Sequence, residues 1–163
     1  MTTDRQNPKV RISPSGEREI HFERVFHAPR DLVWRTFTDP ALIAEWWGGG
    51  ATVEEMDVRV GGTWKFLAGQ KDDGGKFAFE GRYLEVDPPR RLIQTVRNSW
   101  AGQEYTEAVE LEDVGGNQTR FTQITTYETA DQRDTAISYA EQGTSYIYGK
   151  LAQVLKRLSD SAL

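Results

Sequence analysis

The feature that most constrains the fold is a change of periodicity late in the chain. Between Val53 and Glu128, apolar and polar residues alternate in six short segments, which is typical of strands with one buried face. From Ala130 to Leu158, apolar residues recur instead at helical spacing. Six strands followed by one long amphipathic helix predict a sheet whose apolar face is covered by that helix.

Turn residues separate the six predicted strands. Gly61-Gly62 suits a tight turn, residues 72–75 a longer loop, residues 87–89 a rigid corner and residues 115–117 another hairpin. A parallel crossover needs about a dozen residues or more. Because these connections are shorter, we expect every sequential pair of strands to be antiparallel.

The region before Val53 predicts one strand and two short helices. Ile20, Phe22 and Phe26 alternate along a strand, and Pro29 suits the first turn of the helix that follows. Asp39-Pro40 ends that helix and caps a second one. The pair Trp46-Trp47 at the end of the second helix is predicted to be a structural plug beneath it.

The chain has 163 residues, which is the size of one domain. We divide it into a loose polar tail over residues 1–16, which contains Pro8, Pro14 and Gly16, and a single domain over residues 17–163. An internal pocket between the curled sheet and its helix is expected, and function would reside there.

Charge and hydropathy limit the partners. A net charge of -5 argues against a nucleic acid or an anionic membrane, since both require a surplus of Lys and Arg on one face. No apolar run approaches the roughly 18 residues of a membrane helix, and the first residues lack the apolar core of a signal peptide. The absence of Cys fits a reducing compartment, so we expect a cytoplasmic protein. We expect it to be either a monomer or a homodimer.

Several short motifs follow one another in a specific order between Glu19 and Leu158. They are Phe26-His27-Ala28-Pro29-Arg30, Val33-Trp34, Asp39-Pro40, Trp46-Trp47-Gly48, residues 57–62, Gly81-Arg82-Tyr83 and residues 86–92. In that order they resemble the helix-grip proteins of the START and birch-pollen-allergen superfamily (SRPBCC), in particular the family named after the heat-shock protein 90 ATPase activator homologue. That family usually carries a Trp after the glycine of the last helix, whereas Thr144 follows Gly143 here.

The resemblance implies an α+β helix-grip fold. In such a fold a curved antiparallel sheet wraps around a long C-terminal helix, and two short helices follow the first strand. The family name further implies a chaperone as partner and a role in the stress response. One scaffold of this kind hosts many functions, so the activity must be argued from the site.

Side-chain alternation points to one carboxyl group inside the sheet. Val109 and Leu111 are expected to face the core, so Tyr105 and Glu107 on the same strand should also point inward. A buried carboxylate is costly unless it is paired, which makes Glu107 a functional candidate. Two alternatives remain open: Glu107 lies in water at the open end of the sheet, or it pairs with Arg24.

The other candidates are aromatic and amide side chains of the predicted cavity wall. Trp64, Phe66 and Tyr83 alternate on two strands, and Gln123 shares a face with Phe121. Tyr146 and Tyr148 point in different directions on the last helix, so only one of them faces the cavity. The predicted ligand-binding residues are Trp64, Phe66, Tyr83, Tyr105, Glu107, Phe121, Gln123 and Tyr146.

No pattern of a cofactor, metal or nucleophile site stands out. The histidines His21 and His27 lack the spacing of a zinc site, and no Gly-x-Ser-x-Gly turn or Ser-His-Asp order is present. We predict no catalytic residue, no metal and no cofactor. The leading interpretation is a domain that binds a hydrophobic small molecule between sheet and helix. The alternatives are a chaperone ATPase activator-like interaction protein and a cyclase- or hydrolase-type enzyme that uses Glu107 as general base.

Overall fold

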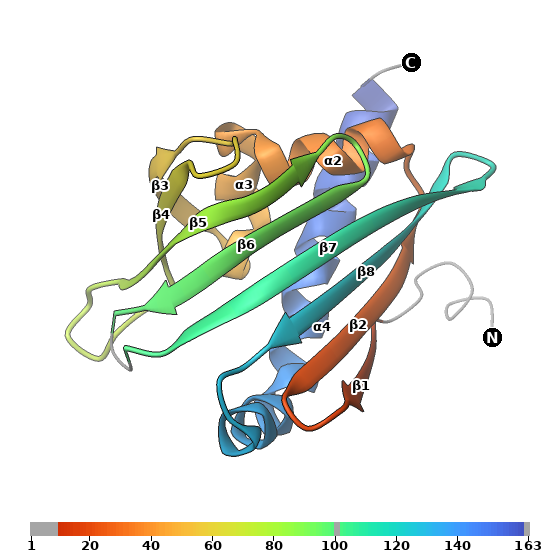
Figure 1. Ribbon diagram of the computed structural model, residues 1–163. Helices are drawn as coiled ribbons and strands as arrows, with labels where there is room; N and C mark the ends of the chain where they lie inside the picture. The colour runs from red at the N-terminus through yellow and green to blue at the C-terminus, as the bar shows by residue number, and fades with distance from the viewer. Residues whose placement is uncertain (1–9, 100–101, 162–163) are drawn as a thin grey trace.

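Eight strands form one antiparallel sheet in the order β1-β2-β8-β7-β6-β5-β4-β3 (Figure 1). The computed structural model describes residues 10–99 and 102–161. Each strand after β3 pairs with the one before it, as the short turns predict. The strands are β1 (Arg11–Ser15), β2 (Glu19–Phe26), β3 (Ala51–Met56), β4 (Thr63–Ala68), β5 (Phe77–Asp87), β6 (Arg91–Asn98), β7 (Glu104–Gly115) and β8 (Gln118–Thr126).

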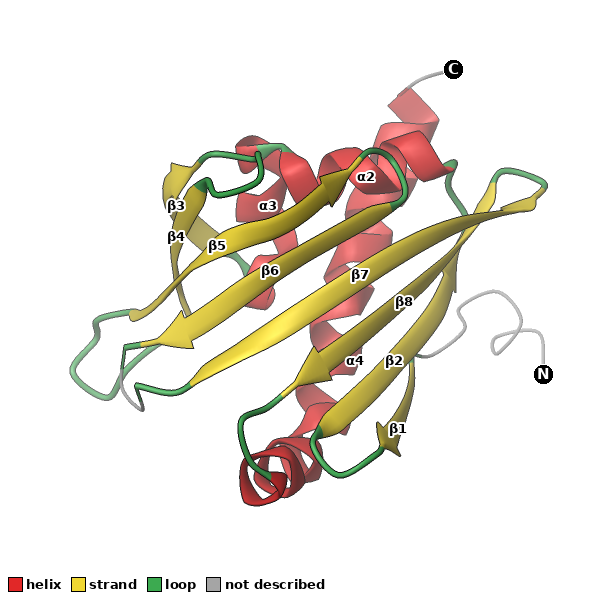
Figure 2. Cartoon of the chain, in the orientation of Figure 1, coloured by secondary structure: helices red, strands yellow, loops and turns green. Residues whose placement is uncertain are grey.

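The helices lie together on one face of the sheet (Figure 2). The short helices α2 (Arg30–Thr38) and α3 (Pro40–Trp46) follow β2, and a 3-10 turn, η1 (Trp47–Gly49), leads into β3. The Asp39 side chain accepts a hydrogen bond from the Ala41 backbone N–H, which caps α3. The long helix α4 (Ala130–Ser161) crosses the sheet, and no helix in the described ranges is long and apolar enough to span a membrane.

This architecture confirms the predicted α+β helix-grip fold, with one strand more than expected. The polar segment predicted to be a loose tail contains β1, so that prediction was wrong for Arg11–Ser15. Pro14 is tolerated because β1 is an edge strand, where a missing backbone donor costs no ladder hydrogen bond. Residues 1–9 lie outside the described part of the chain.

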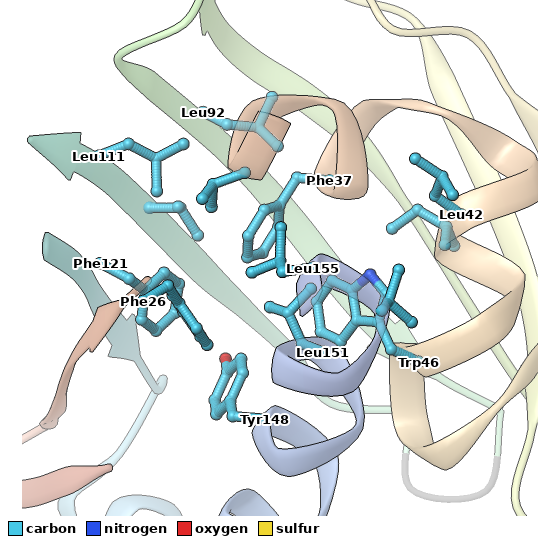
Figure 3. Close-up of a cluster of buried hydrophobic side chains, with 14 of the residues drawn as sticks. Phe26, Phe37, Leu42, Trp46, Leu92, Leu111, Phe121, Tyr148, Leu151 and Leu155 are labelled. Carbon is cyan, nitrogen blue, oxygen red and sulfur yellow. The ribbon is translucent and has the colours of Figure 1, made fainter. Parts of the chain in front are cut away.

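The close-packed part of the core lies where α2 and the second half of α4 meet the sheet (Figure 3). The Phe121 ring, with no exposed surface, stacks on Phe37 at 5.7 Å between ring centroids and contacts Phe26 edge-on at 5.8 Å. The Trp46 indole N–H donates to the backbone carbonyl of Thr36 at 2.8 Å, which ties α3 to α2. Trp46 is therefore the plug that the sequence predicted.

Candidate functional site

A cavity of about 250 Å³ separates the sheet from α3, η1 and the middle of α4. Its volume lies slightly below the roughly 300–1,000 Å³ that is usual for small-molecule pockets. Most of the wall is apolar or aromatic, and a few polar side chains converge in it. The lining residues include Phe22, Trp47, Phe66, Phe79, Tyr83, Gln94, Tyr105, Glu107, Gln123, Thr125, Tyr127, Thr144, Ile147 and Tyr148.

Glu107 points into this cavity from the first third of β7. It stands opposite Gln94 on β6 and Thr125 on β8, so the sheet places polar side chains on both sides of it. The Gln94 amide donates to Glu107 Oε1 at 3.1 Å, and the Gln123 amide donates to Oε2 at 3.3 Å. The side chain is partly accessible by surface area, and that accessible surface faces the cavity.

Gln123 is held in one orientation by a chain of hydrogen bonds. The Tyr148 hydroxyl on α4 donates to Gln123 Oε1 at 2.8 Å. With its oxygen so occupied, the amide nitrogen is directed to Glu107 and to Thr125 Oγ1, the latter at 3.0 Å. Since Tyr148 comes from the helix and Gln123 from the sheet, this chain also links the two layers.

The environment changes the protonation of Glu107. Burial raises the pKa of Glu107 to about 7, although the hydrogen bonds from Gln94 and Gln123 act in the opposite direction. Burial, with a smaller contribution from the Glu107 charge, also raises the pKa of Tyr127 to about 12 and that of Tyr148 well above its ordinary value. The phenols are therefore neutral at any pH near 7, and Glu107 is the group that changes charge there.

Two tyrosine rings close one end of the cavity. Tyr105 on β7 and Tyr127, just after β8, lie 5.1 Å apart between ring centroids. Both rings line the cavity on one side and an outer recess on the other. Asp131, in the first turn of α4, contributes a carboxylate to that outer recess.

The structure brings five of the eight predicted site residues into the cavity wall. Glu107 accepts its hydrogen bonds there from two glutamine amides. On β8, Arg24 lies opposite Phe121, whereas Glu107 lies opposite Thr125, four residues further along. The pairing of Glu107 with Arg24, which the sequence left open, is therefore not observed. The five residues are Phe66, Tyr83, Tyr105, Glu107 and Gln123.

The prediction was wrong for the position of the other three. Trp64 is only 1% exposed and packs against Phe66 and Trp47, whose rings line the cavity in its place. Phe121 is part of the solid core described above. Tyr146 is 60% exposed on the outer side of α4, because two residues of helix separate it from the inward Tyr148 by about 200°.

The predicted set left out further members of the wall, among them Gln94, Tyr148 and Trp47. Gln94 alternates with the buried Leu92 and Val96 on β6, so the parity that identified Glu107 could have found it. Tyr148 was weighed against Tyr146, and only the rotation of α4 decides between them. Trp47 was grouped with Trp46 as a plug, but both residues line the cavity, where the Trp47 ring contacts Phe66 and Phe79.

The chain has a second, larger hollow with a different character. A surface groove of about 550 Å³ runs between the end of β2 and the second half of α4, beside Arg24, Lys156 and Asp160. The smaller cavity is the better candidate site, because polar groups converge in it within an apolar wall. Within the described residues, no group of three His, Cys, Asp or Glu side chains could hold a metal ion.

Comparison with known proteins agrees with this fold. The sequence model of the family "Activator of Hsp90 ATPase homolog 1-like protein" matches residues 27–156. A crystal structure from Rhodobacter sphaeroides has 24% identity and a TM-score of 0.82, and the match covers 91% of this chain and 99% of that one.

Two further structures are similar. A protein from Chromobacterium violaceum has 29% identity and a TM-score of 0.73, with 86% and 98% of the two chains covered. A protein from Nitrosomonas europaea has 27% identity and a TM-score of 0.74, with 89% and 99% covered. No curated protein matches the chain.

Proposed function

The chain belongs to the family of Activator of Hsp90 ATPase homolog 1-like proteins, and we propose that it binds a small molecule with an apolar body and a polar head in the cavity. The apolar body contacts the rings of Trp47, Phe66 and Phe79. The polar head meets Glu107 and the amides of Gln94 and Gln123, which orient it.

The observation that carries this proposal is the position of Glu107. A carboxyl group in an apolar enclosure destabilises the folded protein unless it has partners, and two amides do not use all of the positions at which its oxygens accept hydrogen bonds. A ligand head group that occupies the remaining positions would compensate for the cost of burial. The site therefore combines shape selection by the aromatic wall with one polar anchor.

The space for the ligand depends on a small residue of α4. Thr144 lines the cavity and follows Gly143, where the family pattern usually has Trp. An indole at this position would fill space that the threonine leaves open. We propose that Thr144 makes room for the ligand.

Substitution of Thr144 tests this proposal. Thr144→Trp should abolish binding of the apolar compounds that the parent protein retains, while the protein stays folded. Gln142→Trp is the matched control, because it places the same indole on an exposed position of the same helix. Mass spectrometry of compounds extracted from the purified parent and from both variants measures the outcome.

The expected result is a compound that is present in the parent and in Gln142→Trp and absent from Thr144→Trp. Titration with 2-naphthylethanol, a neutral probe with an apolar body and a polar head, gives a second measurement that does not depend on copurification. If the parent protein neither retains a compound nor binds this probe, the proposal is wrong.

A second candidate is stimulation of a chaperone ATPase, which the family description names. The outer side of α4 offers two exposed aromatic side chains, Tyr139 at 73% and Tyr146 at 60% exposure. Both lie outside the cavity, so this activity can be separated from ligand binding. A Tyr139→Ala, Tyr146→Ala double variant should lose stimulation of Hsp90 ATPase turnover if this candidate holds, and it should keep probe binding.

A third candidate is acid–base catalysis by Glu107, because its carboxyl group lines the cavity and burial raises its pKa to about 7. Glu107→Gln would then bind substrate and lose turnover.

A further inference from the structure

The cavity has a charge of one sign. Glu107 is the only acidic residue among the described lining residues, and no Lys, Arg or His of the described chain lines the cavity. An anionic ligand would therefore meet a carboxylate without a compensating cation. Like charges at close range in a poorly solvated site repel strongly.

The hydrogen bonds of the site leave acceptors for a ligand. Gln94 and Gln123 each donate one N–H to one oxygen of Glu107, and each carboxylate oxygen accepts more than one hydrogen bond. Tyr148 fixes the Gln123 amide, so Gln123 cannot turn its oxygen toward the ligand without losing that bond. The Glu107 carboxylate therefore offers free lone pairs, and these favour a head group that donates hydrogen bonds.

The wall around the anchor suits a positive charge. Trp47, Phe79, Tyr105 and Tyr127 line the same cavity, and an aromatic ring attracts a cation placed over its face. Burial removes the hydration of an ammonium group, so a cation enters only where a carboxylate and ring faces replace that hydration. Both features are present here.

The outer recess carries the same sign of charge. Asp131 supplies a carboxylate, and the other described residues of this recess are neutral: Asn98, Gln103, Tyr105, Tyr127, Gln132, Thr135 and Ala136. The recess and the cavity share the two tyrosines, so a molecule that approaches from this side passes one carboxylate before it reaches the second. A cation is attracted at both positions.

From these observations we infer that the ligand is a small organic cation, an amine attached to a flat ring system, whose ammonium group pairs with Glu107. This inference rests on the proposed function, because it specifies the head group of the ligand in the same cavity. The volume of about 250 Å³ limits the apolar body to about two fused rings.

Three probes with one bicyclic body test the inference: 2-naphthylethylamine, 2-naphthylethanol and 2-naphthylacetate. Isothermal titration at about pH 8 leaves Glu107 ionised, because its pKa lies near 7. The amine should bind about tenfold more tightly than the alcohol, since a charge-assisted hydrogen bond is stronger than a neutral one. The carboxylate should bind more weakly than the alcohol.

Lowering the pH gives a second readout with the unmodified protein. Titratable groups that line the cavity with Glu107 are Tyr83 on β5, Tyr105 on its own strand, Tyr127 after β8 and Tyr148 on α4, and burial raises the pKa of each, so they remain neutral. Among the described lining residues, Glu107 is therefore the one that gains a proton. The affinity for the amine should fall by about tenfold per pH unit below the pKa of Glu107, whereas the affinity for the alcohol should change little.

Glu107→Gln should remove the preference of the amine over the alcohol, and Glu112→Gln is the matched control. Glu112 is on the same strand but exposed and paired with Arg120, so its loss removes the same charge outside the cavity.

If the alcohol binds and the amine is not preferred, or if the carboxylate binds most tightly, the inference is wrong and the proposed function stands. If none of the three probes binds, the inference is wrong, and the proposed function fails as well when the purified parent protein also retains no compound. Since the wild-type series needs no variant, poor folding of Glu107→Gln would leave the decision unchanged.

Discussion

The inward face of β7 has two ends that differ sharply. At one end, Leu111 packs with Phe121 into the solid core beneath α2 and the second half of α4. At the other end, Tyr105 and Glu107 face a cavity. The buried residues of α4 are Tyr148, Leu151, Val154 and Leu155, so the helix seals the sheet with its second half only.

The two ends of β7 show that two separate factors determine how the interior is filled. Strand periodicity determines which side chains point inward, and it is the same at both ends of β7. The covering helix determines whether these side chains meet other atoms or empty space. Stability should therefore depend on one end of the molecule and ligand binding on the other.

Truncating one phenylalanine at each end should show the largest contrast. Phe121→Ala should lower the free energy of unfolding by about 3 to 5 kcal/mol, because a fully packed ring is lost and a void remains. Phe79→Ala, on the cavity wall, should cost about 1 to 2 kcal/mol less, since its ring already lacks neighbours on one side. Urea denaturation followed by far-UV circular dichroism measures both, and equal costs would contradict the division into two ends.

The pH dependence of stability should be the next largest effect. Between about pH 4.5 and about pH 7, folded Glu107 keeps a proton that the unfolded chain releases, so the free energy of unfolding falls as the pH rises through this window. The loss should be on the order of 2 to 3 kcal/mol and should be complete above about pH 7.

Glu107→Gln should remove this component, because glutamine does not titrate. The measurement is urea denaturation at several pH values of the parent, of Glu107→Gln and of the surface control Glu112→Gln. If the parent and Glu107→Gln change in parallel between about pH 4.5 and 7, Glu107 is solvated, and its assignment to an apolar enclosure is wrong.

The smallest effect concerns the two tyrosines of α4. Tyr148→Phe leaves the Gln123 oxygen without its donor and should cost about 1 to 2 kcal/mol, and it should also loosen the hold on Glu107. Tyr146→Phe, the same change on the exposed side, should stay within about 0.5 kcal/mol. Thermal melts of the two variants measure the difference, and a larger cost at Tyr146 would mean that its hydroxyl has a stronger partner than the hydroxyl of Tyr148.

Sequence periodicity was sufficient for the fold because each of its signals is local. Alternation marked six strands from Val53 onward, and Gly and Pro marked the turns between them. It was insufficient for β1, where Arg11–Ser15 is short, polar and contains Pro14. Such an edge strand forms because the backbone of β2 offers unpaired hydrogen-bonding groups along its outer edge. This is a tertiary effect, and the sequence of the segment itself shows little sign of it.

For the site, the sequence predicted which side chains point to the inner face of the sheet, but not how they pack there. Parity put Glu107, Gln123 and Tyr105 inside, since their strands have an unambiguous apolar side. Parity does not say how deep an inward side chain lies. Trp64 and Phe121 were therefore predicted in the cavity wall, whereas Trp64 lies behind it and Phe121 lies in the solid core. The error at Tyr146 has a third origin, because a rotation of α4 by about 200° exchanges it with Tyr148.

The ring pair of Tyr105 and Tyr127 should affect the rates at which a ligand binds and leaves. The two rings form the partition between the outer recess and the cavity, so a molecule that crosses there must first displace a ring. Such a barrier slows arrival and departure by the same factor and leaves the equilibrium constant unchanged. Smaller side chains at these two positions would then shorten the residence time of a bound molecule by a larger factor than they change its dissociation constant.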